Sequence, residues 1–201
     1  MPNDRELGRA ATAAHERFFQ ARRSHPDFPS RAWYLRLYQA GLREWGVADA
    51  DGALAARLHD LTASLPPTLV VEESVPALLE ALRGRGLRLA VISNYTGTLL
   101  DDFKALGLTG YFDAILDSQM LGIYKPDPEI FRVACAATGC KPEEALHVGD
   151  SPAADVAGAL AAGVKPILLD PLDAFAGGLG EFSAVPRIRR LVEVPALLRT
   201  M

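Results

Sequence analysis

The chain is 201 residues long, 49% hydrophobic, and carries a formal net charge of −4. That length suffices for one sizeable core and a small accessory lobe, and the acidic balance argues against a nucleic-acid partner, which would favour a basic face. The amino-terminal residues lack the apolar stretch of a signal peptide, and no apolar run approaches membrane-spanning length. We therefore expect no membrane partner and a cytoplasmic location, which also suits the two cysteines, Cys135 and Cys140.

The first part of the chain is predicted to be helical throughout. Apolar residues at helical spacing predict a helix over residues 4–24. Ser30 is a good N-cap for a second helix, which Gly46 ends, and a third helix is predicted over about 51–64. A Pro-Pro pair follows, so residues 1–67 are predicted to form a small all-helical domain.

Residues 68–201 show a different rhythm, in which short apolar segments alternate with helical patterns. Strands are predicted at residues 87–92, 114–116, 145–148 and 166–169, and helices at residues 74–83, 98–106, 128–138 and 153–162. Short apolar strands separated by helices predict a parallel sheet that is covered by helices on both faces. The fold class is therefore α/β.

The first predicted strand runs into two polar residues, Ser93 and Asn94. In open parallel sheets, ligands bind outside the carboxyl ends of the strands. The Ser93 hydroxyl, Asn94 and nearby backbone N–H groups could therefore hold a phosphate oxygen. A Ser-Asn pair after a strand is also common in a plain turn or a helix cap, so the sequence alone leaves both interpretations open.

A second strand end carries two carboxylates. The strand at 145–148 is followed by Gly149, Asp150 and Ser151, and Asp155 lies on the next helix. Glycine permits a sharp turn, and the two carboxylates would flank the strand end. Oxygen ligands of this kind suit Mg²⁺. Alternatively, Asp150 caps the helix and Asp155 is a surface charge.

Lys125 lies between these two strand ends, in the segment GIYKPDPEIF. The prolines at positions 126 and 128 fix the backbone around it and start a helix just beyond it. A lysine held in this way could balance the charge of nearby carboxylates and of a bound phosphate. The Lys-Pro pair also occurs in ordinary loops.

Taken together, three segments resemble motifs II, III and IV of the haloacid dehalogenase (HAD) superfamily, in order: LRLAVISN, GIYKPDPEIFRVA and HVGDSPAADVAGALAAG. The resemblance covers about residues 74–201 and implies a Rossmann-like parallel sheet. Residues 1–67 resemble the helical cap that family members insert between motifs I and II. The domain division is thus expected to be a cap over 1–67 and a HAD-like α/β core over 68–201.

The resemblance also implies roles for individual residues. The catalytic residues would be Ser93, which binds the transferring phosphoryl group, and Lys125, which stabilises that group and the nucleophile. Asp150 would bind Mg²⁺, with Asp155 supporting the metal site. The substrate would be a small phosphorylated molecule, because family members that cleave carbon–halogen bonds tend to have an uncharged residue in place of Asp150.

One part of the family pattern is not found in the sequence. Motif I is a strand ending in a pattern like Asp-x-Asp-Gly-Thr, and it supplies the nucleophile that forms an aspartyl-phosphate. The segment from Asp49 to Gly52 looks similar but follows a helical pattern, so we interpret it as an inter-helix loop in which Asp49 or Asp51 is an N-cap. We therefore expect this chain, without the nucleophile segment, to be inactive. The alternatives are a non-catalytic HAD-like binding protein and, third, a haloacid dehalogenase.

The missing strand would belong between the strands that end near Ser93 and Asp150. Without it, each of those strands would present a row of unpaired N–H and C=O groups within the core. We expect the chain to self-associate through this open sheet edge, to aggregate, or to close the gap by rearrangement.

Overall fold

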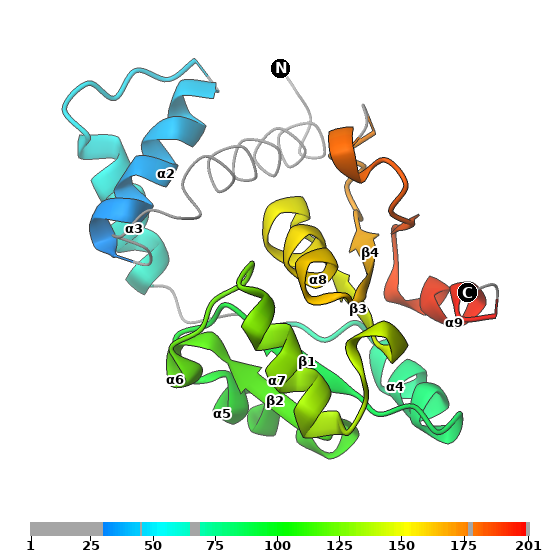
Figure 1. Ribbon diagram of the computed structural model, residues 1–201. Coiled ribbons are helices and arrows are strands. Elements are labelled where there is room, and N and C mark those ends of the chain that lie inside the picture. The colour runs from blue at the N-terminus through cyan, green and yellow to red at the C-terminus, as the bar shows by residue number, and fades with distance from the viewer. Residues whose placement is uncertain (1–29, 45, 65–68, 177–178, 200–201) are drawn as a thin grey trace. The chain divides into compact units, whose positions relative to one another are not determined.

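The structure, a computed structural model, describes residues 30–44, 46–64, 69–176 and 179–199. The chain divides into two compact units (Figure 1). One unit comprises residues 1–68 with 172–178, and the other comprises residues 69–171 with 179–201. No helix of the described residues is long and apolar enough to cross a membrane.

In the described part of the smaller unit, α2 (Arg31–Glu44) packs against α3 (Ala53–Ser64). Trp33 and Ala55 are buried in this unit. Both helices were predicted from their periodicity. The first predicted helix, over residues 4–24, lies outside the described residues.

The two helix starts in this unit are fixed by side-chain caps. The Ser30 hydroxyl accepts a hydrogen bond from the Trp33 amide at 3.2 Å, as predicted for an N-cap. The Asp49 carboxylate accepts from the amides of Leu54 and Ala55, at 2.9 and 3.0 Å. The segment that resembles motif I is therefore an inter-helix loop, as the sequence indicated.

The larger unit contains two separate parallel sheets. β1 (Ala90–Ser93) pairs with β2 (Ala114–Asp117), while β3 (Leu146–Gly149), β4 (Lys165–Leu169) and β5 (Arg187–Ile188) form a second sheet in that order. Every strand pair is parallel, which confirms the predicted fold class. Within the described residues, β1 and β3 each have one partner strand and are not paired with each other.

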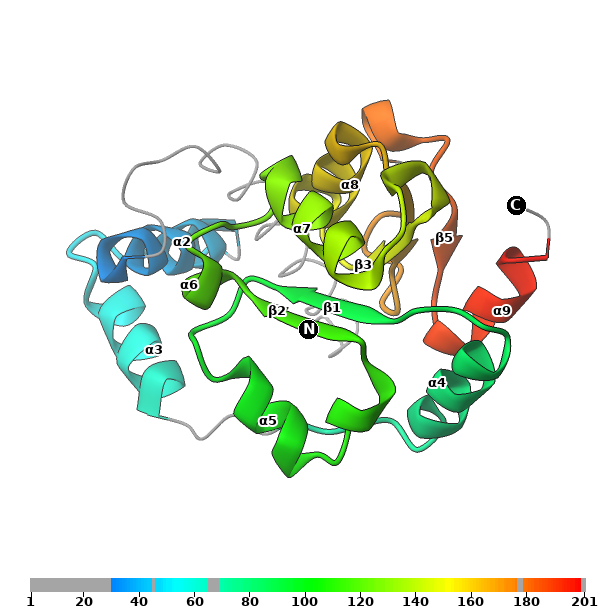
Figure 2. The same ribbon diagram turned by 60° about the horizontal axis from the view of Figure 1, so that its bottom comes forward.

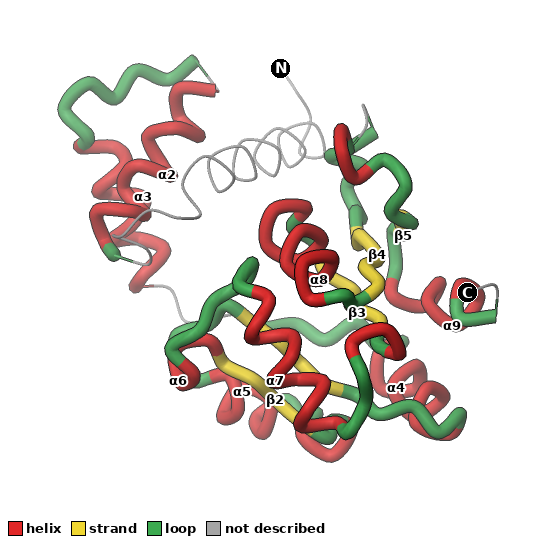
Figure 3. Tube along the Cα trace, viewed as in Figure 1, coloured by secondary structure: helices red, strands yellow, loops and turns green. Residues whose placement is uncertain are grey.

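Short strands surrounded by helices dominate this unit (Figure 3). Its helices are α4 (Val75–Gly84), α5 (Leu99–Ala105), α6 (Ser118–Leu121), α7 (Pro128–Thr138), α8 (Ala157–Ala162) and α9 (Val194–Leu197). Figure 2 shows α7 and α5 on opposite faces of the β1–β2 sheet. The prediction of helices on both faces is thus confirmed for this sheet.

The hydrophobic core of this unit lies between α7 and α8. Its buried members are Ile130, Phe131, Cys135, Ala159, Ala162 and Val164. Ile92 of β1 and Ala145, just before β3, both pack against this cluster, so one helical layer contacts the inner strand of each sheet. A Cβ atom at Gly158 would lie 2.6 Å from Phe131 and 3.0 Å from the Pro126 backbone, which shows how closely α8 approaches α7.

Candidate active site

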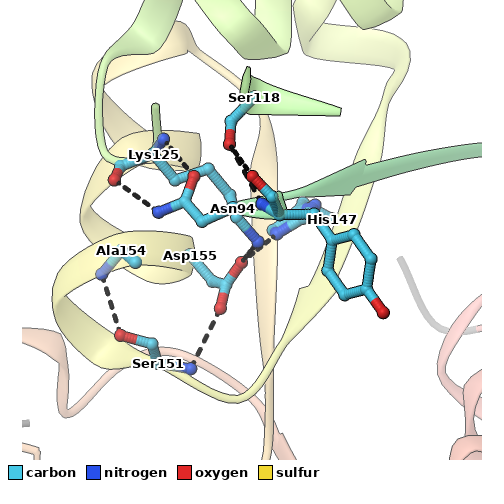
Figure 4. A network of polar contacts seen from close by, with 8 residues as sticks. Asn94, Ser118, Lys125, His147, Ser151, Ala154 and Asp155 are labelled. Carbon is cyan, nitrogen blue, oxygen red and sulfur yellow. Dashed lines mark hydrogen bonds and ion pairs between the residues drawn. The ribbon is translucent and has the colours of Figure 1, made fainter. Parts of the chain in front are cut away.

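A buried ion pair joins the segment before α7 to the turn before α8. The Lys125 ammonium lies 2.6 Å from Oδ1 of Asp155, and the two side chains are only 12% and 4% exposed (Figure 4). Two charges buried in this way are stable only when further hydrogen bonds satisfy them. The surroundings of Asp155 provide these bonds.

His147 and Ser151 complete the environment of the carboxylate. Nε2 of His147 lies 2.7 Å from Oδ1, and the Ser151 amide donates to Oδ2 at 3.0 Å. Because an ionised carboxylate can only accept, Nε2 of His147 must carry the proton. The imidazole ring packs edge-on against Phe131, with the ring centroids 4.9 Å apart. Both oxygens of Asp155 are therefore engaged within the protein.

These contacts determine the charge state of Asp155. Burial by itself would raise its pKa, but the hydrogen bond from His147 and the positive charge of Lys125 outweigh burial and hold the pKa well below the ordinary value. Asp155 is consequently ionised at neutral pH. It pairs with the Lys125 ammonium and keeps that group in one place.

The backbone around Asp155 departs from the predicted helix over 153–162. Residues Pro152–Val156 form a wider π-helical turn, and α8 begins only afterwards. The amides of Asp155 and Val156 both donate to the Ser151 carbonyl, at 2.8 and 3.2 Å. At this widened turn, Asp155 points into the protein and is buried.

Gly149 leaves the space that the Asp155 carboxyl group occupies. It is not among the glycines with positive φ. A Cβ atom at this position would lie 2.1 Å from the Asp155 carboxyl carbon. Any side chain at Gly149 would therefore collide with the carboxylate that pairs with Lys125.

Asn94, which directly follows β1, makes two hydrogen bonds to the backbone of Lys125. Its Nδ2 donates to the Lys125 carbonyl at 3.0 Å, and the Lys125 amide donates to its Oδ1 at 2.8 Å. Asn94 was predicted to bind phosphate, and a contact through its side chain would compete with both of these bonds. The preceding residue, Ser93, ends β1 opposite Asp117 and is half-buried. The structure thus brings Asn94, Lys125 and Asp155 into one network, with Ser93 beside it.

Asp150 differs from every residue of this network because it is exposed. It follows directly after β3, and no hydrogen bond or ion pair to it is found in the part of the chain that the structure describes. Its carboxylate is free to accept a cation. No cluster of three or more His, Cys, Asp or Glu side chains suited to a metal occurs among the described residues. Mg²⁺ is commonly held by one or two carboxylates together with water molecules, so an exposed Asp150 carboxylate is compatible with the predicted role in metal binding.

Sequence reasoning missed three residues around this site. They are His147, Asp117 and Ser118. An ionisable residue within an apolar strand was the available signal for His147. For the other two, the signal was polar residues directly after an apolar strand, the same argument that had singled out Ser93 and Asp150.

Comparison with known proteins agrees with the motifs. A family model of haloacid dehalogenase-like hydrolases matches residues 4–163. The haloacid dehalogenase-like hydrolase domain-containing protein 3 of Bos taurus is 36% identical over 178 residues, which cover 81% of this chain and 70% of the bovine protein. The ribulose-1,5-bisphosphate 5-phosphatase of Halopiger xanaduensis is 32% identical over 169 residues, which cover 83% of this chain and 63% of that enzyme. The chain thus spans about two thirds of the length of these relatives.

A solved structure shares the fold. The HAD-hydrolase YfnB of Bacillus subtilis, whose crystal structure contains magnesium, aligns with a TM-score of 0.63 and 22% identity, covering 99% of this chain and 85% of YfnB. This likeness concerns the fold alone. Together with the family model and the sequence relatives, which include phosphatases, it confirms the resemblance seen in the motifs: the chain belongs to the haloacid dehalogenase-like hydrolase family.

Proposed function

We propose that the network around Lys125 is the phosphate site of a Mg²⁺-dependent phosphatase that acts on a small phosphorylated molecule. The observation that carries this proposal is the Lys125 ammonium, held by the buried Asp155 beside a strand end that exposes Asp150. A fixed cation and an exposed carboxylate suit a phosphate group and its metal ion. The phosphatases among the relatives support the same substrate class.

In this proposal, Lys125 and Ser93 contact the phosphate directly. The ammonium donates hydrogen bonds to the phosphate and offsets its negative charge, while the Ser93 hydroxyl, at the end of β1, donates to a second oxygen. Asn94 keeps the Lys125 backbone in place. Asp150 is the protein ligand for Mg²⁺, which would neutralise further charge on the phosphate.

Asp155 takes the role of a positioning residue rather than a direct metal ligand. Its Oδ1 is shared by Lys125 and His147, and its Oδ2 accepts from the Ser151 amide. A metal ion bound directly to Asp155 would have to displace one of these donors and would lie close to the Lys125 charge. Fixing the ammonium is the function that its contacts support.

Binding without hydrolysis is a second candidate function for the 201-residue chain. The sequence shows no strand that ends in a motif I aspartate, and the similar segment at Asp49 caps α3. Without an aspartate nucleophile the covalent route is closed. We expect purified chain to bind phosphate and to show no Mg²⁺-dependent hydrolysis of an aryl phosphate. Turnover that is lost in Asp49→Asn or Asp51→Asn would contradict this expectation.

Self-association through the open sheet edges also remains part of the proposal. The inner edges of β1 and β3 have no strand partner within the described residues, although α7 and α8 cover both sheets. Exposed strand edges favour pairing with another chain. We expect the mass in solution, measured by sedimentation, to exceed that of a monomer. A soluble, cooperatively unfolding monomer would contradict this expectation.

The phosphate site itself is tested by titrating inorganic phosphate while recording amide NMR spectra. The test variant is Lys125→Met, and the matched control is Lys104→Met, which removes an equally charged but exposed side chain of α5. We expect Lys125→Met to weaken phosphate binding by about tenfold or more, the effect of losing a charged hydrogen bond, whereas the control should bind like the unaltered chain. Equal affinity in the two variants would contradict the proposal.

A further inference from the structure

The strand β2 ends in a buried carboxylate, that of Asp117. Asp117 is 7% exposed, and within the described residues no ion pair to it is found. Its Oδ2 accepts hydrogen bonds from the amides of Gly97 and Leu99, at 2.8 and 3.2 Å, and its Oδ1 accepts from the Gln119 amide at 2.9 Å. Three backbone donors replace the water that this carboxylate loses on burial.

One of these bonds, from the Leu99 amide, caps α5, a helix that Asp117 does not belong to. The first amides of a helix need acceptors, and the residue before the helix usually provides one. Thr98, the residue before α5, makes no such bond. Asp117 reaches across from β2 and accepts from Leu99, the first residue of α5, while also capping its own helix α6.

Ser118, which follows Asp117, bonds the segment between β1 and α5 at another residue. Ser118 is fully buried, and its hydroxyl accepts from the Tyr95 amide at 3.0 Å and donates to the Tyr95 carbonyl at 3.4 Å. Residues 94–98, which we call the β1–α5 loop, are thus fastened to the end of β2 through Tyr95, Gly97 and the start of α5.

The β1–α5 loop in turn holds Lys125. Its first residue, Asn94, bonds both the amide and the carbonyl of Lys125 (Figure 4). We propose that Asp117 and Ser118 are positioning residues, which fix the β1–α5 loop and through Asn94 set the place of the Lys125 backbone. The importance of that place for phosphate rests on the function proposed above.

This arrangement also narrows where a phosphate can bind. The amides of Tyr95, Gly97 and Leu99 are occupied by Ser118 and Asp117, so they are not free to bind an anion. Fewer backbone N–H groups near Ser93 are therefore available to bind phosphate than the sequence suggested.

Whether Asp117→Asn strengthens or weakens phosphate binding distinguishes a positioning role of Asp117 from a purely electrostatic one. Asp117 is negative, so removing its charge should strengthen the binding of an anion nearby if charge were its only influence. In Asp117→Asn, one carboxylate oxygen becomes an NH₂ group, which donates hydrogen bonds and cannot accept them, so at least one of the three amides loses its acceptor. If Asp117 positions the loop, phosphate should instead bind more weakly.

The first experiment needs no ligand and measures amide hydrogen exchange in the 201-residue chain. The matched control is Asp101→Asn, which removes the same charge from an exposed position of α5. We expect Asp117→Asn to speed exchange by about tenfold or more at Lys125 and at whichever of Gly97, Leu99 and Gln119 loses its acceptor, because the loop opens without global unfolding. The control should leave these amides unchanged. Unaltered exchange at Lys125 in folded Asp117→Asn would overturn the proposal.

A second variant guards against loss of folding. Ser118→Ala removes only a hydroxyl, and it should speed exchange at Tyr95 and Lys125 but not in α7. If neither amide responds, Ser118 is not a positioning residue. Inorganic phosphate is then titrated into the same samples, where we expect about threefold to tenfold weaker binding by Asp117→Asn than by the control. Tighter binding would overturn the positioning claim. No binding by the unaltered chain would contradict the proposed function alone, because the exchange data stand without it.

Discussion

Two segments of this chain each contain a pair of aspartates but use them differently. The loop before α3 contains Asp49 and Asp51, whose oxygens accept from backbone amides of their own helix. The loop after β3 exposes Asp150 and buries Asp155 against a lysine and a histidine. Residue type alone does not decide the role of a carboxylate. What its oxygens contact decides whether it caps a helix, fixes a cation or stays free for a ligand.

The largest expected effect is a loss of unfolding free energy when Asp155 is replaced by an uncharged residue. Asp155→Asn leaves the Lys125 ammonium buried without its partner, which costs about 3–5 kcal/mol. Urea unfolding of the variant and the unaltered chain measures this loss. A loss below about 1 kcal/mol, typical of exposed ion pairs, would mean that the pair is not buried in solution.

Low pH should reduce the contribution of the Asp155–Lys125 ion pair to the free energy of unfolding. The pKa of Asp155 is lower in the folded chain than its ordinary value of 3.8, so its stabilising contribution is complete above that value. As the pH falls below it, the unfolded state takes up a proton first and the contribution is lost. The difference in unfolding free energy between the unaltered chain and Asp155→Asn should therefore narrow below about pH 4. A difference that stays constant down to about pH 3 would contradict the lowered pKa.

A smaller effect is expected in the helix-capping loop. Asp49→Ala removes the acceptor for the Leu54 and Ala55 amides and should cost about 1 kcal/mol, the usual value for an N-cap. Thermal unfolding measures the change, with Asp101→Ala as a control at an exposed position. A cost comparable to that of Asp155→Asn would remove the distinction between the two loops.

Local signals predicted the elements that depend on local contacts. The helix over 128–138 was predicted at its observed bounds, with the neighbouring prolines marking its start. In the structure Asp127 caps that start, and Gly139, at φ 71°, ends the helix. Ser30, and either Asp49 or Asp51, were identified as helix caps from their residue type and position. Short elements such as β5 and α6 were missed because two to four residues carry no measurable periodicity.

Contacts between distant segments could not be predicted. The strand predicted at 87–92 begins only at Ala90, because the ladder with β2 starts opposite Ala114. The motifs placed Lys125 and Asp155 in the site. The contacts of His147 with Asp155 and of Asn94 with Lys125 could not be predicted, because the tertiary fold brings these residues together. Sequence patterns thus identified which residues carry the chemistry but not which ones hold them in place.

Only the loop after β3 is expected to bind Mg²⁺ and phosphate, so the most direct test compares a substitution in that loop with one in the loop before α3. The affinity of the chain for inorganic phosphate is measured by calorimetry with and without Mg²⁺, for Asp150→Asn and for Asp49→Asn, which remove the same charge. We expect Mg²⁺ to tighten phosphate binding in the unaltered chain and in Asp49→Asn, and to have no effect in Asp150→Asn. An undiminished effect of Mg²⁺ in Asp150→Asn, or its loss in Asp49→Asn, would contradict the assignment of the metal and phosphate site to the carboxyl end of β3.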